Sequence, residues 1–199
     1  MHYDKQYYML VEANGSGDFM MGNVEGTDEG LLHLLAKRSL KKEVLGPGKV
    51  EVLHGNKRRF TPCDYHRAGG MLVSEKFKQV IDGFNAPKVD FYQTDIHNLG
   101  QTWSDHYFMH VWNNHRVMHH GRSKINGTYE NDRFILESFS LDEDLMDNIP
   151  LEERLIFRLS EKPKFLFHET VMEELDKANL TGLGFAKVTG FDLRALMGL

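Results

Sequence analysis

The sequence predicts an α+β fold, a single domain over residues 1–199 in which a mixed β-sheet carries about three helices. The first observation is a pattern that occurs twice, at 72–84 and at 166–178, each time as an apolar run followed by an amphipathic helix. The two copies are either a pseudo-duplication within one domain or a coincidence, because strand-helix-strand units are common. The second is that a short apolar run follows each helix, as expected for a strand that returns to a sheet. The third is a length of 199 residues, enough to bury roughly 70% of the surface of the unfolded chain.

The N-terminal part is expected to contribute strands and the first helix. Tyr7–Val11 and Phe19–Gly22 are apolar runs that flank a turn signal made of asparagine, glycine and serine. Acidic residues precede the leucines of 31–35 and basic residues follow at 37–42, so the charges match both ends of a helix dipole. Val50–Leu53 alternates as a further strand.

The first copy of the repeated segment predicts a strand, a helix and a strand. Met71–Val73 is an apolar run, and Ser74 is a good N-cap for a helix whose apolar residues at 77, 80, 81 and 84 share one face. Val89–Tyr92 then resumes as a strand.

The second copy follows the same order. Two strands are expected at 155–160 and 165–167, and the second of them is apolar throughout, as in a strand buried on both faces. Thr170 and Glu173 have the spacing of a capping box at the start of a helix. Leu183–Val188 completes the unit as a short strand.

The composition of the chain indicates the cellular compartment and the kind of partner to expect. The net charge is −5 and the chain has one cysteine, Cys63, so no internal disulfide can form. An acidic balance disfavours nonspecific nucleic-acid binding and suits a basic partner. No apolar run reaches the roughly 20 residues of a membrane span, and the first residues lack the pattern of a secretion signal. We therefore expect a cytoplasmic protein with no nucleic-acid or membrane partner. No cofactor is expected either, because no phosphate loop or dinucleotide fingerprint occurs.

Cys63 is a candidate for nucleophilic chemistry. His66 lies three residues away, and a nearby base can activate a thiol. No cysteine-hydrolase signature surrounds Cys63, however, and an unpaired cysteine more often behaves as a small hydrophobe. The sequence therefore favours a structural role for this residue.

The basic run Lys57–Arg59 is a candidate phosphate-binding element. On an acidic protein, a short basic run is more typical of a solvated hairpin edge. The second interpretation is favoured.

Five histidines within fifteen residues are a candidate metal site, because neutral imidazole is the commonest metal ligand. The residues around the first two have strand propensity, and on a strand residues four apart are too distant to share an ion. Asn113-Asn114, which lies among them, is typical of a hairpin turn. The cluster is either a half-polar sheet face or the site of a metal-dependent hydrolase. The histidines are His106, His110, His115, His119 and His120.

The strongest charge bias lies between residues 137 and 153, which hold seven carboxylates and no lysine or arginine. The alternating oxygens and central glycine of a calcium loop are missing. Such a cluster can imitate nucleic-acid phosphates and steer a basic protein into place, and it can equally be a solvated face. The candidate partner-binding residues are Asp142, Glu143, Asp144, Asp147, Glu152 and Glu153.

Five segments of the chain together form a recognisable pattern. They are the first copy of the repeat (71–92), HYFMHVWN at 106–113, Arg122-Ser123, IFRL at 156–159 and FHETVMEELDKANLTGLGF at 167–185. These segments resemble a bacterial immunity-protein family whose genes lie beside polymorphic toxins and type VI secretion effectors. The resemblance covers about 71–188, which leaves residues 1–70 as an N-terminal extension of strand and helix. His168 stands where that family often has a small polar cap.

The resemblance implies a non-enzymatic immunity protein that binds a cognate secreted toxin and occludes it. Inhibition by occlusion needs no catalytic residues, and the sequence contains no nucleophile elbow or HExxH helix. Two alternatives stay open, the metal-dependent hydrolase of the His106–His120 cluster and a structural protein that associates with itself through a sheet edge. The identity of the toxin is beyond reach, because immunity proteins are matched to toxins by surface residues.

Overall fold

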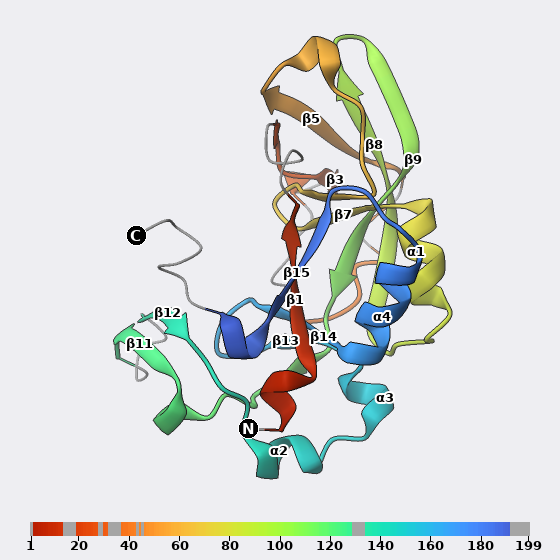
Figure 1. Cartoon of the computed structure of the whole chain (residues 1–199). Coiled ribbons are helices and arrows are strands. Elements are labelled where there is room, and N and C mark those ends of the chain that lie inside the picture. The colour runs from red at the N-terminus through yellow and green to blue at the C-terminus, as the bar shows by residue number, and fades with distance from the viewer. Residues whose placement is uncertain are drawn as a thin grey trace.

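The computed structural model describes residues 2–13, 19–27, 30–31, 37–42, 44, 46–128 and 134–191 (Figure 1). The described strands form two larger mixed sheets and a two-stranded ribbon, so the single mixed sheet expected from the sequence is replaced by two. Among these residues there are four α-helices, and none is long and apolar enough to span a membrane. The α+β class is confirmed at this level.

The larger sheet has one parallel pair, β5 with β8, and its other pairs are antiparallel. The hairpin of β8 and β9 is its longest element and extends to the upper end of the molecule (Figure 1). In spatial order its strands are β4 (Gly30–Leu31), β3 (Glu25–Thr27), β5 (Gly48–His54), β8 (Val89–Asn98), β9 (Gln101–Val111), β7 (Met71–Ser74) and β6 (Tyr65–Arg67), with β2 (Met20–Met21) paired to β5.

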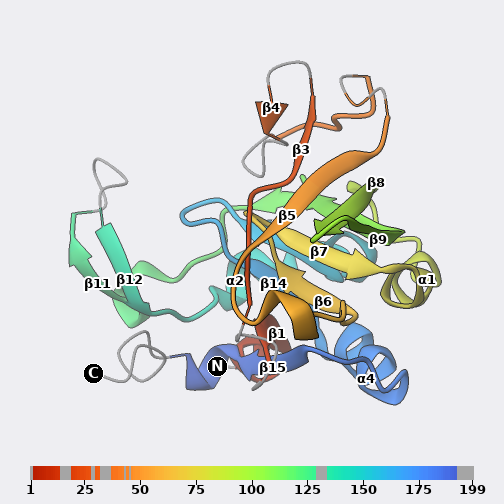
Figure 2. The same cartoon turned by 90° about the horizontal axis from the view of Figure 1, so that it is seen from above.

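The smaller sheet is also mixed, because β10 and β13 are parallel. The separate ribbon of β11 (Lys124–Gly127) and β12 (Phe134–Ser138) extends to one side of both sheets (Figure 2). The strands of the smaller sheet are, in order, β10 (Asn114–His115), β13 (Ile156–Leu159), β14 (Phe165–His168), β1 (Tyr7–Glu12) and β15 (Leu183–Lys187).

The helices divide into two that pack on sheets and two short ones at the lower end of the molecule. The packed helices are α1 (Glu75–Asp82) and α4 (Glu169–Lys177), and the short ones are α2 (Glu143–Asp147) and α3 (Leu151–Arg154) (Figure 1). The short 3-10 turns are η1 (Tyr3–Lys5), η3 (Lys57–Arg59), η4 (His120–Arg122) and η6 (Val188–Gly190).

The two copies of the repeated segment fold into the same supersecondary unit. In each unit, a helix connects two parallel strands, and one antiparallel strand lies between these strands in the sheet. In the first unit, α1 connects β7 with β8, and β9 lies between them. In the second unit, α4 connects β14 with β15, and β1 lies between them. The pseudo-duplication inferred from the sequence is therefore present in the topology.

The two units share one core, which joins the sheets. Phe77 and Ile81 of α1 pack in the same apolar cluster as Val171 and Leu175 of α4, and all four are fully buried. The helices lie side by side in both views (Figures 1 and 2). Burial of side chains of this size stabilises a fold by about 2 kcal/mol each, so this junction is a principal source of stability.

The caps of the two helices differ in chemistry. Ser74 Oγ accepts the N–H of Phe77 at 3.2 Å, as predicted for the first helix. In the second, His168 is the N-cap and its Nδ1 accepts the N–H of Thr170 at 3.3 Å. The predicted capping box of Thr170 and Glu173 is wrong, because the helix begins one residue before Thr170.

The helix predicted from the leucines of 31–35 is wrong where the structure describes it. Leu31 lies in β4, paired with Glu25 of β3, and residues 37–42 form bends and a turn instead of a last helical turn. Residues 32–36 lie outside the described part of the chain. Strand pairing has overridden the local helical pattern at Leu31.

The predicted hairpin turn at Asn113-Asn114 is also wrong. Here the chain leaves the larger sheet and enters the smaller one, where Asn114 pairs with Arg158 in a parallel bridge. The side chain of Asn113 is buried and donates to the carbonyl oxygens of Glu153 and Ile156 at 2.6 and 3.0 Å. The Asn113 amide therefore supplies hydrogen bonds to two backbone carbonyl groups of another segment of the chain, instead of forming a turn.

Candidate functional site

The acidic segment forms an exposed surface over α2 and α3 at the lower end of the molecule (Figure 1). We call it the α2–α3 surface. It brings together all six carboxylates proposed from the sequence with two exposed leucines. Its residues are Asp142, Glu143, Asp144, Leu145, Asp147, Leu151, Glu152 and Glu153.

Three of the six carboxylates have structural partners. Asp142 is the N-cap of α2 and accepts the N–H of Leu145 at 3.2 Å. Glu143 accepts the backbone N–H of His2 at 2.6 Å. Asp147 accepts the hydroxyl of Tyr3 at 2.5 Å. These carboxylates therefore hold α2 and the N-terminal segment in place, which the sequence did not indicate.

The other three, Asp144, Glu152 and Glu153, present exposed carboxylates to solvent. Leu145 and Leu151 lie beside them in sequence and are 46% and 44% exposed. Exposed leucines among fixed like charges combine an apolar contact with a strong field, and protein interfaces use both.

Contacts from the N-terminal segment hold the chain on both sides of this surface. The buried carboxylate of Asp4 accepts the hydroxyl of Ser140 at 2.6 Å and the N–H of Leu141 at 2.7 Å, directly before α2. The guanidinium group of Arg154 lies 4.8 Å from the centre of the Tyr3 ring, which ties the end of α3 to the same segment. A surface fixed in this way loses little conformational entropy when a partner binds.

The five histidines do not gather at one place. His106 lies 2.8 Å from Asp105 Oδ1 through Nδ1 and 3.1 Å from the Cys63 carbonyl oxygen through Nε2. His110 is fully buried beside the ring of Phe108. In the part of the chain that the structure describes, no three metal-ligating side chains come together. The remaining three have separate surroundings. His115 Nε2 lies 3.1 Å from the carbonyl oxygen of Glu153, and His119 Nδ1 accepts the N–H of Arg122. His120 is exposed in η4.

Cys63 and His66 are neighbours, but their hydrogen bonds are structural. The Sγ atom lies 3.4 Å from His66 Nε2, yet that nitrogen accepts the N–H of Cys63 itself at 3.0 Å, and the thiol donates to the Tyr65 carbonyl oxygen at 3.2 Å. Burial raises the pKa of the Cys63 thiol, which disfavours the thiolate that a nucleophile needs. The contacts fit the structural role that the sequence favoured.

His66 should make stability depend on pH. Burial, assisted by the neighbouring His106, lowers the pKa of His66 from 6.5 to about 4. Between these values the unfolded chain binds a proton that the folded chain does not, so the stability present above about pH 6.5 is lost as the pH falls toward 4. We expect a loss of about 1 kcal/mol per pH unit in urea unfolding. His66→Gln, which keeps an acceptor for the Cys63 N–H, should give a shallower slope than wild type, and an equal slope would contradict the assignment.

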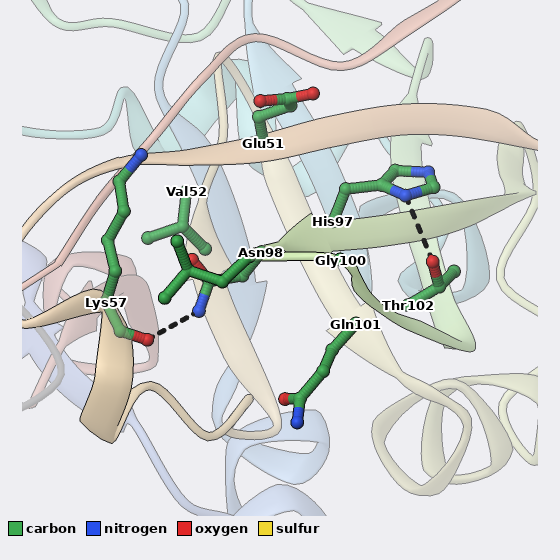
Figure 3. Close-up of a pocket in the computed structure, with 9 residues that line it drawn as sticks. Glu51, Val52, Lys57, His97, Asn98, Gly100, Gln101 and Thr102 are labelled. Carbon is green, nitrogen blue, oxygen red and sulfur yellow. Dashed lines mark hydrogen bonds between the residues drawn. The ribbon is translucent and has the colours of Figure 1, made fainter.

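A pocket of about 350 Å³ lies at the other end of the molecule, beside the turn between β8 and β9. Figure 3 shows the amide of Asn98 donating to the carbonyl oxygen of Lys57 at 2.6 Å, and His97 Nδ1 is 3.1 Å from the Thr102 hydroxyl oxygen. Of the basic run 57–59, Lys57 lines this pocket, whereas Arg58 and Arg59 do not. Nothing in the sequence singled out the turn, because its residues come from a region without a charge or motif bias.

The described residues thus define an α+β protein with an exposed and strongly acidic surface. The sequence matches the immunity protein family (Imm11) over residues 35–190, more than three quarters of the chain, and the protein therefore belongs to this family. The resemblance stated from the sequence is confirmed, and the match begins well before residue 71. No curated protein matches the chain.

Proposed function

We propose that this protein is a non-enzymatic immunity protein that binds a cognate secreted toxin in the cytoplasm and covers the surface that the toxin needs for its activity. The toxin would be the product of a neighbouring gene in a polymorphic-toxin or type VI secretion system. The observation that carries the proposal is the α2–α3 surface in a member of an immunity family.

The chemistry of this surface favours a basic partner. Asp144, Glu152 and Glu153 carry negative charge without a lysine or arginine between residues 142 and 153. Toxins that act on nucleic acids or other polyanions are basic around their substrate sites, and a carboxylate surface competes for the same groups. Leu145 and Leu151 supply apolar contacts that lose water on binding.

Occlusion is stoichiometric, so the proposal places no requirement on the histidines or on Cys63. Affinity would come from the surface alone, and long-range attraction would speed the encounter. Fast capture suits an inhibitor that must find a toxin before the toxin finds its substrate.

Co-expression with the toxin-domain product of the adjacent gene tests the proposal. We expect cells that produce both proteins to survive, and the two proteins to elute together as a complex of fixed stoichiometry. A toxin of the same class from an unrelated locus is the matched control and should neither bind nor be neutralised. Death of the co-expressing cells, with the immunity protein abundant and folded, would refute the proposal for that pair.

A further inference from the structure

The turn that joins β8 and β9 carries an unusual residue. Leu99 and Gly100 form a two-residue hairpin turn between the paired residues Asn98 and Gln101, and both have positive φ values, 48° and 82°. Asparagine or glycine is the usual first residue of such a turn, because a bulky side chain disfavours the left-handed conformation. Leu99 is also 66% exposed. Within the monomer, leucine at this position is therefore unfavourable both for the backbone and for solvation.

Exposed apolar and basic residues lie at the same end of the molecule as Leu99, together with the carboxylate of Glu51, which lines the pocket beside Lys57 and Leu99. Leu53 is exposed on β5, next to the pairing of Met20 with His54, and Lys57 and Leu99 line the same pocket. Arg58 and Arg59 follow in η3 and are exposed. We call this surface the hairpin tip, and it consists of Met20, Leu53, Lys57, Arg58, Arg59 and Leu99.

The hairpin tip is the chemical complement of the α2–α3 surface. One carries exposed apolar side chains and three cationic residues against the single carboxylate of Glu51, and the other carries exposed leucines beside carboxylates. The two lie at opposite ends of the molecule, so they do not meet within one chain (Figure 1). We propose that the hairpin tip of one copy docks on the α2–α3 surface of a second copy, in an antiparallel pair with two equivalent contacts. Such a pair closes at two copies, as a two-fold dimer does.

Self-pairing would cover the surface proposed for the toxin. The free protein would then be stored as a dimer, and toxin binding would compete with pairing for Asp144, Leu145 and their neighbours. This competition rests on the proposed function, whereas pairing itself does not.

A charge exchange between the two surfaces tests the pairing without any toxin. In a variant with Arg58→Glu and Arg59→Glu, and in another with Asp144→Lys and Glu152→Lys, both contacts of a homodimer bring like charges together. In a mixture of the two variants, both contacts of the mixed dimer again join opposite charges. We expect sedimentation equilibrium to show a wild-type dimer that weakens with salt, each variant alone as a monomer, and a dimer in the mixture.

Leu99→Asn separates a binding role from a folding role. It should raise the urea midpoint of unfolding, because asparagine accepts the turn conformation, and should weaken the dimer at least about 10-fold by loss of a buried apolar contact. Ile135→Asn, which removes an exposed apolar side chain from β12, is the matched control and should leave the dimer unchanged. A wild-type protein that stays monomeric at all concentrations, a dimer that survives in both charge variants, or a mixture that stays monomeric would each overturn the proposal.

Discussion

Gly182→Ala should destabilise the protein by about 3 kcal/mol, because the new methyl group has no space and the backbone is unsuitable for it. Gly182 has a φ of +75°, and a Cβ atom there would lie 2.2 Å from Cys63 Sγ and 2.8 Å from the Tyr65 carbonyl oxygen. The turn cannot move away easily, since Asp64 accepts both the N–H and the hydroxyl of Thr181 at 2.7 and 2.8 Å. Urea unfolding of the variant measures the loss.

Gly190→Ala is the matched control for this substitution. It has no atom within 4 Å of a new Cβ, so its unfolding free energy should stay within about 0.5 kcal/mol of wild type. Adding Cys63→Ala to the Gly182 variant should recover part of the loss, because it removes one of the two clashes. Equal stability of the Gly182 and Gly190 variants would show that the contact between the Cys63 loop and the turn before β15 is not tight.

The elements that the sequence predicted correctly are those whose signal is local. The strands at 71–73 and 165–167 and the helices that follow them have an apolar period that lies within about ten residues. The first helix also has the predicted cap, Ser74, whereas the cap predicted for the second helix was wrong. Their repetition also predicted two similar supersecondary units, but not the strand that lies between the two parallel strands of each unit. Local consistency of this kind is what makes a segment predictable.

The predictions that failed have two different causes. Leu31 has a helical pattern around it, but it pairs with the nearby Glu25 in a short antiparallel pair of strands. Asn113 has turn chemistry, but its side chain bonds to Glu153 and Ile156, which are far away in the chain. The division into two sheets is likewise set by which strands pair, and strands of either sheet have the same composition. A single sequence carries no direct signal for such pairings.

The sequence indicated where the acidic segment lies in the chain, but not which of its carboxylates have structural partners. The charge bias alone indicated this segment, because residues 137–153 contain seven carboxylates and no lysine or arginine. The structural roles of Glu143 and Asp147 depend on His2 and Tyr3, more than 130 residues away, whereas Asp142 caps α2 locally. Leu99 was missed for a different reason, since its strain exists only once the hairpin has formed.

The difference between carboxylates with structural partners and exposed carboxylates decides which residues a charge reversal should replace. Asp142, Glu143 and Asp147 hold α2 and the N-terminal segment, so their replacement would confuse binding with stability. Asp144→Lys with Glu152→Lys reverses exposed charges and leaves these contacts intact. We expect association with a basic toxin to slow by about 10- to 100-fold at low salt, because steering scales with the charge of the two surfaces.

The salt dependence makes this prediction specific. At about 500 mM NaCl the association rates of variant and wild type should converge, since screening removes the long-range attraction that the substitutions reverse. Glu173→Lys with Asp176→Lys on α4 makes the same change in net charge on exposed positions outside the α2–α3 surface and should slow association far less. Equal slowing by both variants would mean that the toxin responds to net charge alone. Unchanged association in the first variant would remove the α2–α3 surface from the interface, whereas a loss confined to it would show that Asp144 and Glu152 face the toxin.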